Sequence, residues 1–464
     1  MAIIVGGAAG WLSIWNITLP VAQAIVAVAG IALILSAMFG RTDLLVPTII
    51  ITTPIEISKL WIPILKAPSS WYGYDVSLLD VGRVSIVLAL GLWLARSMVI
   101  GRVTFARGKI PFLAIALVGF AIVSLVYTFD PIRGRNEALR LFFNLALMFV
   151  VARFSRSEGR VYALASVWMA VASILSIVAL WQYTSSVSFW NPQLQEGATR
   201  RINATFADPN TFASFLNVAA LFGVCLLATR RERPAPWSLG LGLSLAGLVV
   251  TYSRSGWLAF AIGVAVWGIL FARGARALAL FGLFLIGAVA VLIAVPSIGE
   301  RLATLDSYDN LSVRPWLIQA GLTIFGEHPI GGLGIGSFQL AVATDYAWAY
   351  PFWWYVTASH TSFVTTLAEL GIVGMTITLL LLAAALYRAW GIACDKAQTP
   401  RTRGLARGAL LGIVVLVIAG QTIGALFEEP YIWMLLGALM VLGRSGARQR
   451  LGEDALAPVD DRLA

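Results

Sequence analysis

Residues 360–387, HTSFVTTLAELGIVGMTITLLLLAAALY, decide the fold of this chain. After a polar start the stretch is apolar for long enough to cross a bilayer as one helix, which takes about 20 residues. Its only charged residue is Glu369, and it opens on His360, one of two histidines in the protein. Titratable groups at or below a membrane surface are costly to keep and mark functional sites by default. The stretch therefore predicts a membrane-spanning helix and a candidate reaction centre.

The composition extends the membrane prediction to the whole chain. Of the 464 residues, 59% are hydrophobic and 12% are charged, whereas soluble domains carry about 25% charged residues. Long apolar runs without alternation predict helices, because a spanning segment must satisfy its own backbone hydrogen bonds in lipid. We expect an all-α polytopic membrane protein with about 12–14 transmembrane helices. The predicted spans are residues 17–39, 44–64, 78–95, 110–127, 139–152, 161–183, 211–229, 237–252, 256–272, 277–296, 361–387, 408–427 and 431–443.

The positions of lysine and arginine orient these spans. Most of the 33 basic residues fall in one alternating set of short loops and in the C-terminal tail, which places both in the cytoplasm. This topology accounts for the net charge of +10, so no nucleic-acid partner is expected. The predicted organisation is transmembrane helices over 1–296 with a smaller non-cytoplasmic loop at about 184–210, a large non-cytoplasmic loop over 297–359, transmembrane helices over 360–443 and a disordered tail over 444–464.

Few residues could bind a metal through nitrogen or sulfur. Cys225 and Cys394 are scattered, and with two histidines they do not supply a typical ligand set. We expect no disulfide framework, no metal site and no cofactor, although carboxylates could still bind a hard cation. The aromatic run at 348–355 has two open interpretations, an interfacial belt or a surface that contacts sugar or lipid.

Several arginines lie on the side that the positive-inside rule disfavours. Arg200 and Arg201 end the smaller loop, Arg254 lies between two apolar runs, and Arg314 lies in the large loop. The planar guanidinium presents a fork of donors that matches phosphate oxygens. These arginines predict a phosphate or pyrophosphate site at the membrane surface. The alternative is that each side chain grips a lipid headgroup.

His360 is the candidate general base, because a neutral imidazole can accept a proton at physiological pH. Nearby arginines would favour that neutral form. Alternatively, His360 caps a helix. Glu369 lies nine residues further on, on the opposite side of the helix and about 13 Å deeper, so the two cannot form a simple dyad. Its expected role is to pair with a buried arginine or lysine.

Four further residues are candidates for supporting roles. Asp208 and Asn210 flank a proline at the start of an apolar run, an arrangement typical of a helix N-terminus that would also allow substrate contact. Glu428 and Glu429 lie in the short turn between the last two runs, where they could pair with the outer arginines or cap a helix. His328, in a glycine-rich segment, is expected to have a structural role in a turn.

Together these elements resemble the O-antigen ligase/polymerase superfamily of bacterial membrane glycosyltransferases. The stretch from His360 is similar to the family motif of His, a small polar residue, nine residues, Gly, two residues and Gly, with Gly371 and Gly374 in place and Thr361 departing from the usual residue. The segment 254–258 resembles the Arg-x-x-x-Leu element of the family. Further similar segments are Phe206-Ala207-Asp208-Pro209-Asn210, Arg314-Pro315-Trp316 and Pro329-Ile330-Gly331-Gly332-Leu333-Gly334.

The resemblance implies a large-loop fold of the GT-C type in the bacterial inner membrane, with a periplasmic active site and a cytoplasmic C-terminus. It implies metal-independent, inverting transfer of a glycan from undecaprenyl pyrophosphate to a sugar hydroxyl, with lipid A-core or a growing glycan as acceptor. His360 would correspond to the base of the family. Arg254, and Arg200 or Arg201, would hold the pyrophosphate, and Arg314 is a further candidate.

Three other functions stay open. A polymerase would use the same donor chemistry to extend a chain on its lipid carrier, and a third activity in the family glycosylates protein side chains. A lipid or glycolipid transporter would need charges deep in the bilayer. Charged residues in apolar runs that would fit a transporter are Glu56, Lys59, Asp80 and Arg83.

Overall fold

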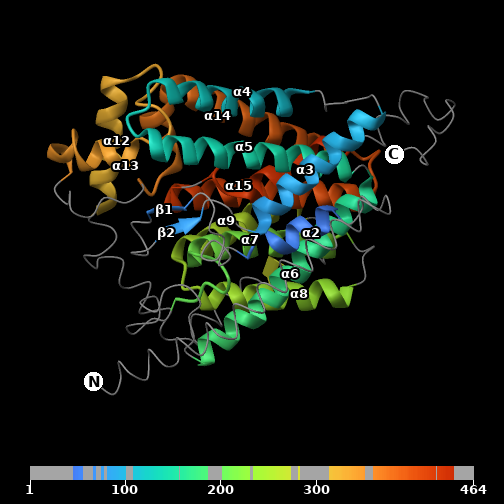
Figure 1. Cartoon of the computed structure of the whole chain (residues 1–464). Helices are drawn as coiled ribbons and strands as arrows, with labels where there is room; N and C mark the ends of the chain where they lie inside the picture. The colour runs from blue at the N-terminus through green and yellow to red at the C-terminus, as the bar shows by residue number, and fades with distance from the viewer. Residues whose placement is uncertain are drawn as a thin grey trace.

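The computed structural model is a bundle of long helices (Figure 1). It describes residues 45–55, 66–68, 75–77, 81–100, 108–155, 157–185, 201–229, 234–272, 279, 281–282, 313–350, 359–424 and 426–443. The helices are α2 (Leu45–Thr52), α3 (Val81–Ile100), α4 (Lys109–Val123), η3 (Ser124–Val126), α5 (Pro131–Phe154), α6 (Glu158–Ser185), α7 (Pro209–Leu227), α8 (Pro234–Val250), α9 (Arg254–Phe271), α12 (Val313–Glu327), α13 (Phe338–Ala343), η6 (Ala347–Ala349), α14 (Ser362–Cys394), α15 (Pro400–Ile423) and α16 (Pro430–Val441).

The predicted all-α polytopic class is confirmed. Within the described residues, 6 helices are long and apolar enough to cross a membrane, and α8 and α16 are shorter apolar helices. The predicted span 17–39 and most of 277–296 lie outside the described residues, so the total of about 12–14 spans stays a prediction. One small antiparallel hairpin, β1 (Lys66–Pro68) with β2 (Asp75–Ser77), was not predicted, because three-residue strands are too short to show alternation.

Helix α7 forms the centre of the bundle. It packs against α6, α8, α9 and α15, and 89% of its apolar window is buried. A helix that is apolar all round, as α7 is, belongs in such a position. At its N-terminal half Phe215 stacks on Trp168 with ring centroids 5.4 Å apart and meets Tyr431 edge-on at 5.4 Å. This aromatic core fixes the start of α7, which is the part that reaches the candidate site.

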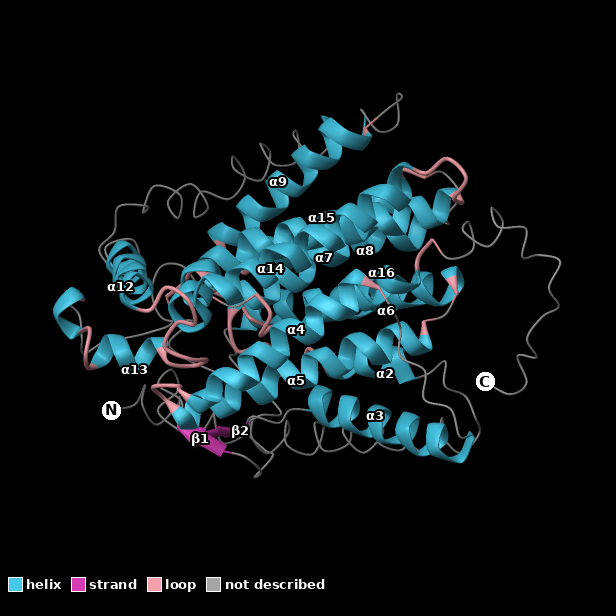
Figure 2. Cartoon of the chain, turned by 90° about the horizontal axis from the view of Figure 1, so that it is seen from above, coloured by secondary structure: helices cyan, strands magenta, loops and turns pink. Residues whose placement is uncertain are grey.

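Helices α12 and α13 lie together beyond one end of the bundle in both views (Figures 1 and 2). They share a second, smaller apolar core. Tyr350 is fully buried in this core, which also includes Ala368 on α14. This small unit falls within the loop predicted over 297–359, and it is therefore an ordered helical element seated on the start of α14.

The connection between α12 and α13 docks onto a break in α14. Gly371, inside α14, has φ of 60°, and the backbone N–H groups of Leu333 and Gly334 donate to the carbonyls of Ala368 and Glu369 at 2.9 and 2.8 Å. A Cβ on Gly332 would lie 2.3 Å from the carbonyl carbon of Glu369. The glycines therefore allow two backbones to approach closely, which agrees with the turn role expected for this segment.

Candidate functional site

Four helices begin at one electropositive cluster. Asp208 is the N-cap of α7, Arg254 is the first residue of α9, Arg314 lies in the first turn of α12, and His360 precedes α14 by two residues. The electrostatic interactions of Arg314 join it to Arg201, Arg254 and Asp208, and those of His360 join it to Arg314 and Asp208. Helix N-termini carry partial positive charge and unpaired N–H groups, so the arrangement favours an anion.

The first wall of the cluster is a hydrogen-bonded link between the starts of α7 and α9. Asp208 Oδ1 accepts from the backbone N–H of Asn210 at 3.1 Å, which caps α7. Asn210 Oδ1 accepts from Arg201 Nη2 at 3.0 Å and from Ser253 Oγ at 2.7 Å. Ser253 Oγ in turn accepts from the N–H of Gly256 at 3.1 Å and caps α9. The proposed helix start at Asp208-Pro209-Asn210 is thus confirmed, and Asn210 also contacts an arginine of the cluster.

The burial of Arg201 and Arg314 is only partly offset by nearby negative charge. Burial lowers the pKa of Arg201 and of Arg314, the charge of Arg254 acts in the same direction on both, and Asp208 opposes it. Guanidinium groups stay protonated regardless, so a bound anion would offset part of the cost of burying them. Nε of Arg201 and Nε of Arg314 are buried and have no hydrogen-bond partner among the described residues. An unsatisfied buried donor costs about 1–3 kcal/mol, which a bound anion would recover.

His360 is held in an unusual backbone conformation at the second wall. Its φ is 57°, in the left-handed region that non-glycine residues seldom occupy. The turn is fixed by Ser359, whose Oγ accepts from the N–H of Thr361 at 3.0 Å. Gln421 on α15 fixes the helix start, because its Nε2 donates to Ser362 Oγ at 2.8 Å. Such strain is retained where the surroundings enforce it, commonly at functional sites.

Burial lowers the pKa of His360 to about 4, and the charge of Arg314 acts in the same direction. Asp208 and a hydrogen bond with the backbone of Thr422 oppose this shift. At neutral pH the imidazole is therefore uncharged, and its role as the general base stays a prediction.

Strained backbone gathers at this end of the bundle. In the described part of the chain, Ala204, Tyr252 and His360 are the non-glycine residues with positive φ. Ala204 lies between Arg201 and Asp208, and Tyr252 lies two residues before Arg254. Each strained residue thus adjoins a segment that supplies a charged group to the cluster.

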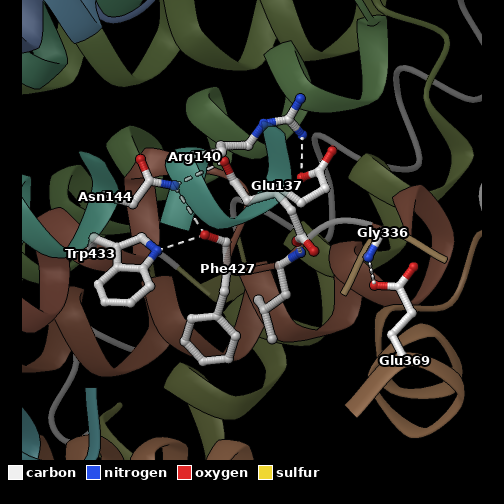
Figure 3. Close-up of polar contacts among 9 residues, drawn as sticks. Glu137, Arg140, Asn144, Gly336, Glu369, Phe427 and Trp433 are labelled. Carbon is white, nitrogen blue, oxygen red and sulfur yellow. Dashed lines mark hydrogen bonds and ion pairs between the residues drawn. The ribbon is translucent and has the colours of Figure 1, made fainter. Parts of the chain in front are cut away.

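Glu369 has a different partner from the arginine or lysine expected for it. Its carboxylate accepts from the backbone N–H of Gly336 at 2.8 Å (Figure 3) and from that of Phe338 at 3.1 Å. It thereby joins α14 to the start of α13. Glu369 therefore helps to hold the α12–α13 unit on α14. Its predicted position on the opposite side of the helix from His360 agrees with this role.

The two glutamates of the last turn directly precede α16. The backbone carbonyl of Glu428 accepts from Asn144 Nδ2 at 3.0 Å, and Figure 3 shows Asn144 together with the ion pair of Glu137 and Arg140. Glu428 Oε2 accepts from the N–H of Leu426 at 2.9 Å, and Glu429 takes the N-cap position of α16 without a side-chain cap bond. Burial and the charge of Glu137 raise the pKa of Glu428, and Arg140, which contacts Glu137 at 3.2 Å, opposes them. The arginine near Glu428 is therefore one that the sequence did not single out.

The structure leaves some of the sequence predictions untested. Arg200 and most of the aromatic run 348–355 lie outside the described residues. In the described part of that run Trp348 is 73% exposed and Tyr350 is buried. Cys225 and Cys394 are free thiols.

Sequence reasoning missed Ser253 and Gln421, although a serine directly before an expected helix start is a recognisable N-cap.

The comparison with known proteins bears on this cluster. No curated protein matches the chain. A family model described as O-antigen ligase matches residues 239–379, a segment that includes Arg254, Arg314 and His360. The chain therefore carries an O-antigen ligase family domain at residues 239–379, and the resemblance drawn from its sequence is confirmed.

Proposed function

We propose that the protein is a glycosyltransferase of the bacterial inner membrane that works on its periplasmic face. It moves a glycan from undecaprenyl pyrophosphate to a sugar hydroxyl, most simply as an O-antigen ligase whose acceptor is lipid A-core. The observation that supports this proposal is the convergence of a neutral histidine with three arginines where four helices begin. The C-terminus would then lie in the cytoplasm, on the side of the basic loops.

The proposed reaction divides the work between His360 and the arginines. The imidazole of His360 accepts the proton of the acceptor hydroxyl as its oxygen attacks the anomeric carbon of the donor. The bond between that carbon and the pyrophosphate oxygen breaks, with inversion, and the electron pair leaves with the lipid pyrophosphate. Arg201, Arg254 and Arg314 stabilise the developing charge, together with the helix N-termini. In this proposed reaction the arginines and helix N-termini stabilise the leaving pyrophosphate, so no metal ion is needed.

The pH dependence of transfer follows from the pKa of His360. The neutral imidazole is the active form, so activity is retained above the pKa and lost as the pH falls through it. We expect kcat/KM to stay level from about pH 8 down to about pH 5 and to fall with a midpoint near the pKa of about 4, because this parameter reports the free enzyme. A bound pyrophosphate favours the imidazolium, so the midpoint for kcat should lie higher. A kcat/KM midpoint near 6.5 would contradict the buried, arginine-flanked environment.

A comparison of acceptors tests the function directly. Purified protein in liposomes receives a lipid-linked glycan donor and either lipid A-core or further donor as acceptor. We expect glycan to appear on lipid A-core. Chain growth on the lipid carrier alone would identify a polymerase, and an inactive wild-type protein that moves the donor across the bilayer would identify a transporter.

The charged residues that would fit a transporter are largely untested by the structure. Glu56, Lys59 and Asp80 lie outside the described residues, and Arg83 is buried in α3.

A further inference from the structure

We propose that Asn210 is a positioning residue that aligns Arg201 and the start of α9 to receive the pyrophosphate. This inference rests on the proposed function and adds a specific role for one amide. Asn210 lies in the first turn of α7 and bonds to Asp208, Arg201 and Ser253. Its side chain therefore contacts both segments that carry the cations, the one with Arg201 and the one that leads into Arg254.

The orientation of the Asn210 amide is fixed by the chemistry of its neighbours. Its Nδ2 faces the carboxylate of Asp208, with 3.2 Å to Oδ1 and 3.1 Å to Oδ2, and a carboxylate can only accept. Its Oδ1 faces Nη2 of Arg201, and a guanidinium can only donate. A flipped amide would place donor against donor and acceptor against acceptor. The oxygen is therefore the atom that faces the arginine.

This arrangement has two consequences for the arginines. A single oxygen of Asn210 accepts from both Arg201 and Ser253. Because Ser253 immediately precedes Arg254, this oxygen fixes the position of Arg201 relative to the start of α9, where Arg254 lies. The amide nitrogen also covers both oxygens of Asp208. Among the described residues no ion pair joins Asp208 to Arg201, so Asp208 offsets the charge of Arg201 only from a distance. An arginine fixed in this way loses less side-chain entropy when the ligand binds.

The test separates affinity for the donor from the rate of the chemical step. In Asn210→Ala we expect the donor KM, and the Kd for undecaprenyl pyrophosphate by native mass spectrometry, to rise about tenfold, as for loss of a hydrogen bond to a charged group. The value of kcat should fall by less than the donor Kd rises, because His360 is untouched while Arg201, which also faces the charge that develops on the leaving pyrophosphate, is less well aligned. Ser214→Ala is the matched control on α7, since Ser214 Oγ bonds to the backbone carbonyl of Asn210 and not to its side chain.

A double-mutant cycle tests whether Asn210 acts through Arg201. The Kd increase in Asn210→Ala combined with Arg201→Gln should be smaller than the product of the two single increases. Asn210→Asp is the second variant, in which a carboxylate would draw Arg201 into an ion pair and also raise the Kd. Thermal unfolding tests whether each variant is folded. If Asn210→Ala does not fold, the Kd of Asn210→Asp tests the positioning role.

The outcomes for the inference and for the proposed function are distinct. A wild-type protein that neither binds undecaprenyl pyrophosphate nor transfers glycan would overturn the proposed function. A wild-type protein that does both, with unchanged Kd in folded Asn210→Ala or Asn210→Asp, or with multiplicative effects in the cycle, would overturn the positioning role alone.

Discussion

His360→Ala is expected to abolish glycan transfer, with kcat falling by about 10²–10⁴-fold, while the protein stays inserted and folded. Without the imidazole, the described residues at the start of α14 offer no other base to take the acceptor proton as the glycosidic bond forms. The arginines remain, so the donor should still bind. The assay is transfer from lipid-linked glycan by purified protein, with donor binding measured in parallel. A His360→Ala variant that still transfers glycan at the wild-type rate would contradict the proposed mechanism.

The backbone at His360 calls for a second variant. Its φ of 57° is strained for alanine, which disfavours left-handed conformations by about 1–2 kcal/mol. Asparagine tolerates this region better but is not a base at neutral pH. His360→Asn should therefore be as stable as the wild-type protein in thermal unfolding and as inactive as the alanine variant. If asparagine restored transfer, the histidine would have a purely structural role.

His328 supplies the matched control. It is exposed at the end of α12, and its backbone N–H continues the helix by donating to the carbonyl of Ile324 at 2.9 Å. His328→Ala removes the other histidine of the protein from a site that the proposed mechanism does not use. Transfer should stay within about threefold of wild type, because surface substitutions of this kind have small effects.

Much of the site could be predicted from charges in unfavourable places. In the predicted topology Arg201, Arg254 and Arg314 lie on the side that the positive-inside rule disfavours, and His360 lies where an apolar run begins. The structure brings these residues into one electrostatic cluster. Helix starts were predictable for a related reason, since proline after a capping residue is a local signal. Such signals lie in residues that are adjacent in the sequence, so they can be recognised without knowing the fold.

The interactions that position these residues could not be predicted in the same way. The partners of Glu369 are backbone amides at Gly336 and Phe338, and backbone groups leave no mark in the residue type. The link from Asn210 to Ser253 joins residues 43 positions apart, and only packing of α7 against α9 brings them together. A glutamate in an apolar run suggested a cationic partner, whereas the connection between α12 and α13, which docks at the break of α14 at Gly371, supplies the N–H donors.

Arg254→Lys is expected to lower kcat/KM by about 100-fold, although the substitution preserves charge. Loss of one preorganised donor at a site of developing charge reduces rates by about 10²–10³-fold. A lysine offers a single compact ammonium, which cannot reproduce the planar fork that binds two phosphate oxygens at once. Arg254 is also the first residue of α9, so its side chain starts from a rigid element and a lysine cannot relocate to compensate.

The comparison that tests this expectation uses a second arginine at the same end of the bundle. Arg135 is exposed near the start of α5, and Arg135→Lys should leave transfer within about threefold of wild type. If the role of Arg254 were only to attract an anionic lipid, both lysine variants would retain activity, because an ammonium attracts a distant charge as well as a guanidinium does. A large loss in Arg254→Lys alone, appearing in kcat as well as in the donor KM, would instead place the guanidinium against the leaving pyrophosphate in the transition state.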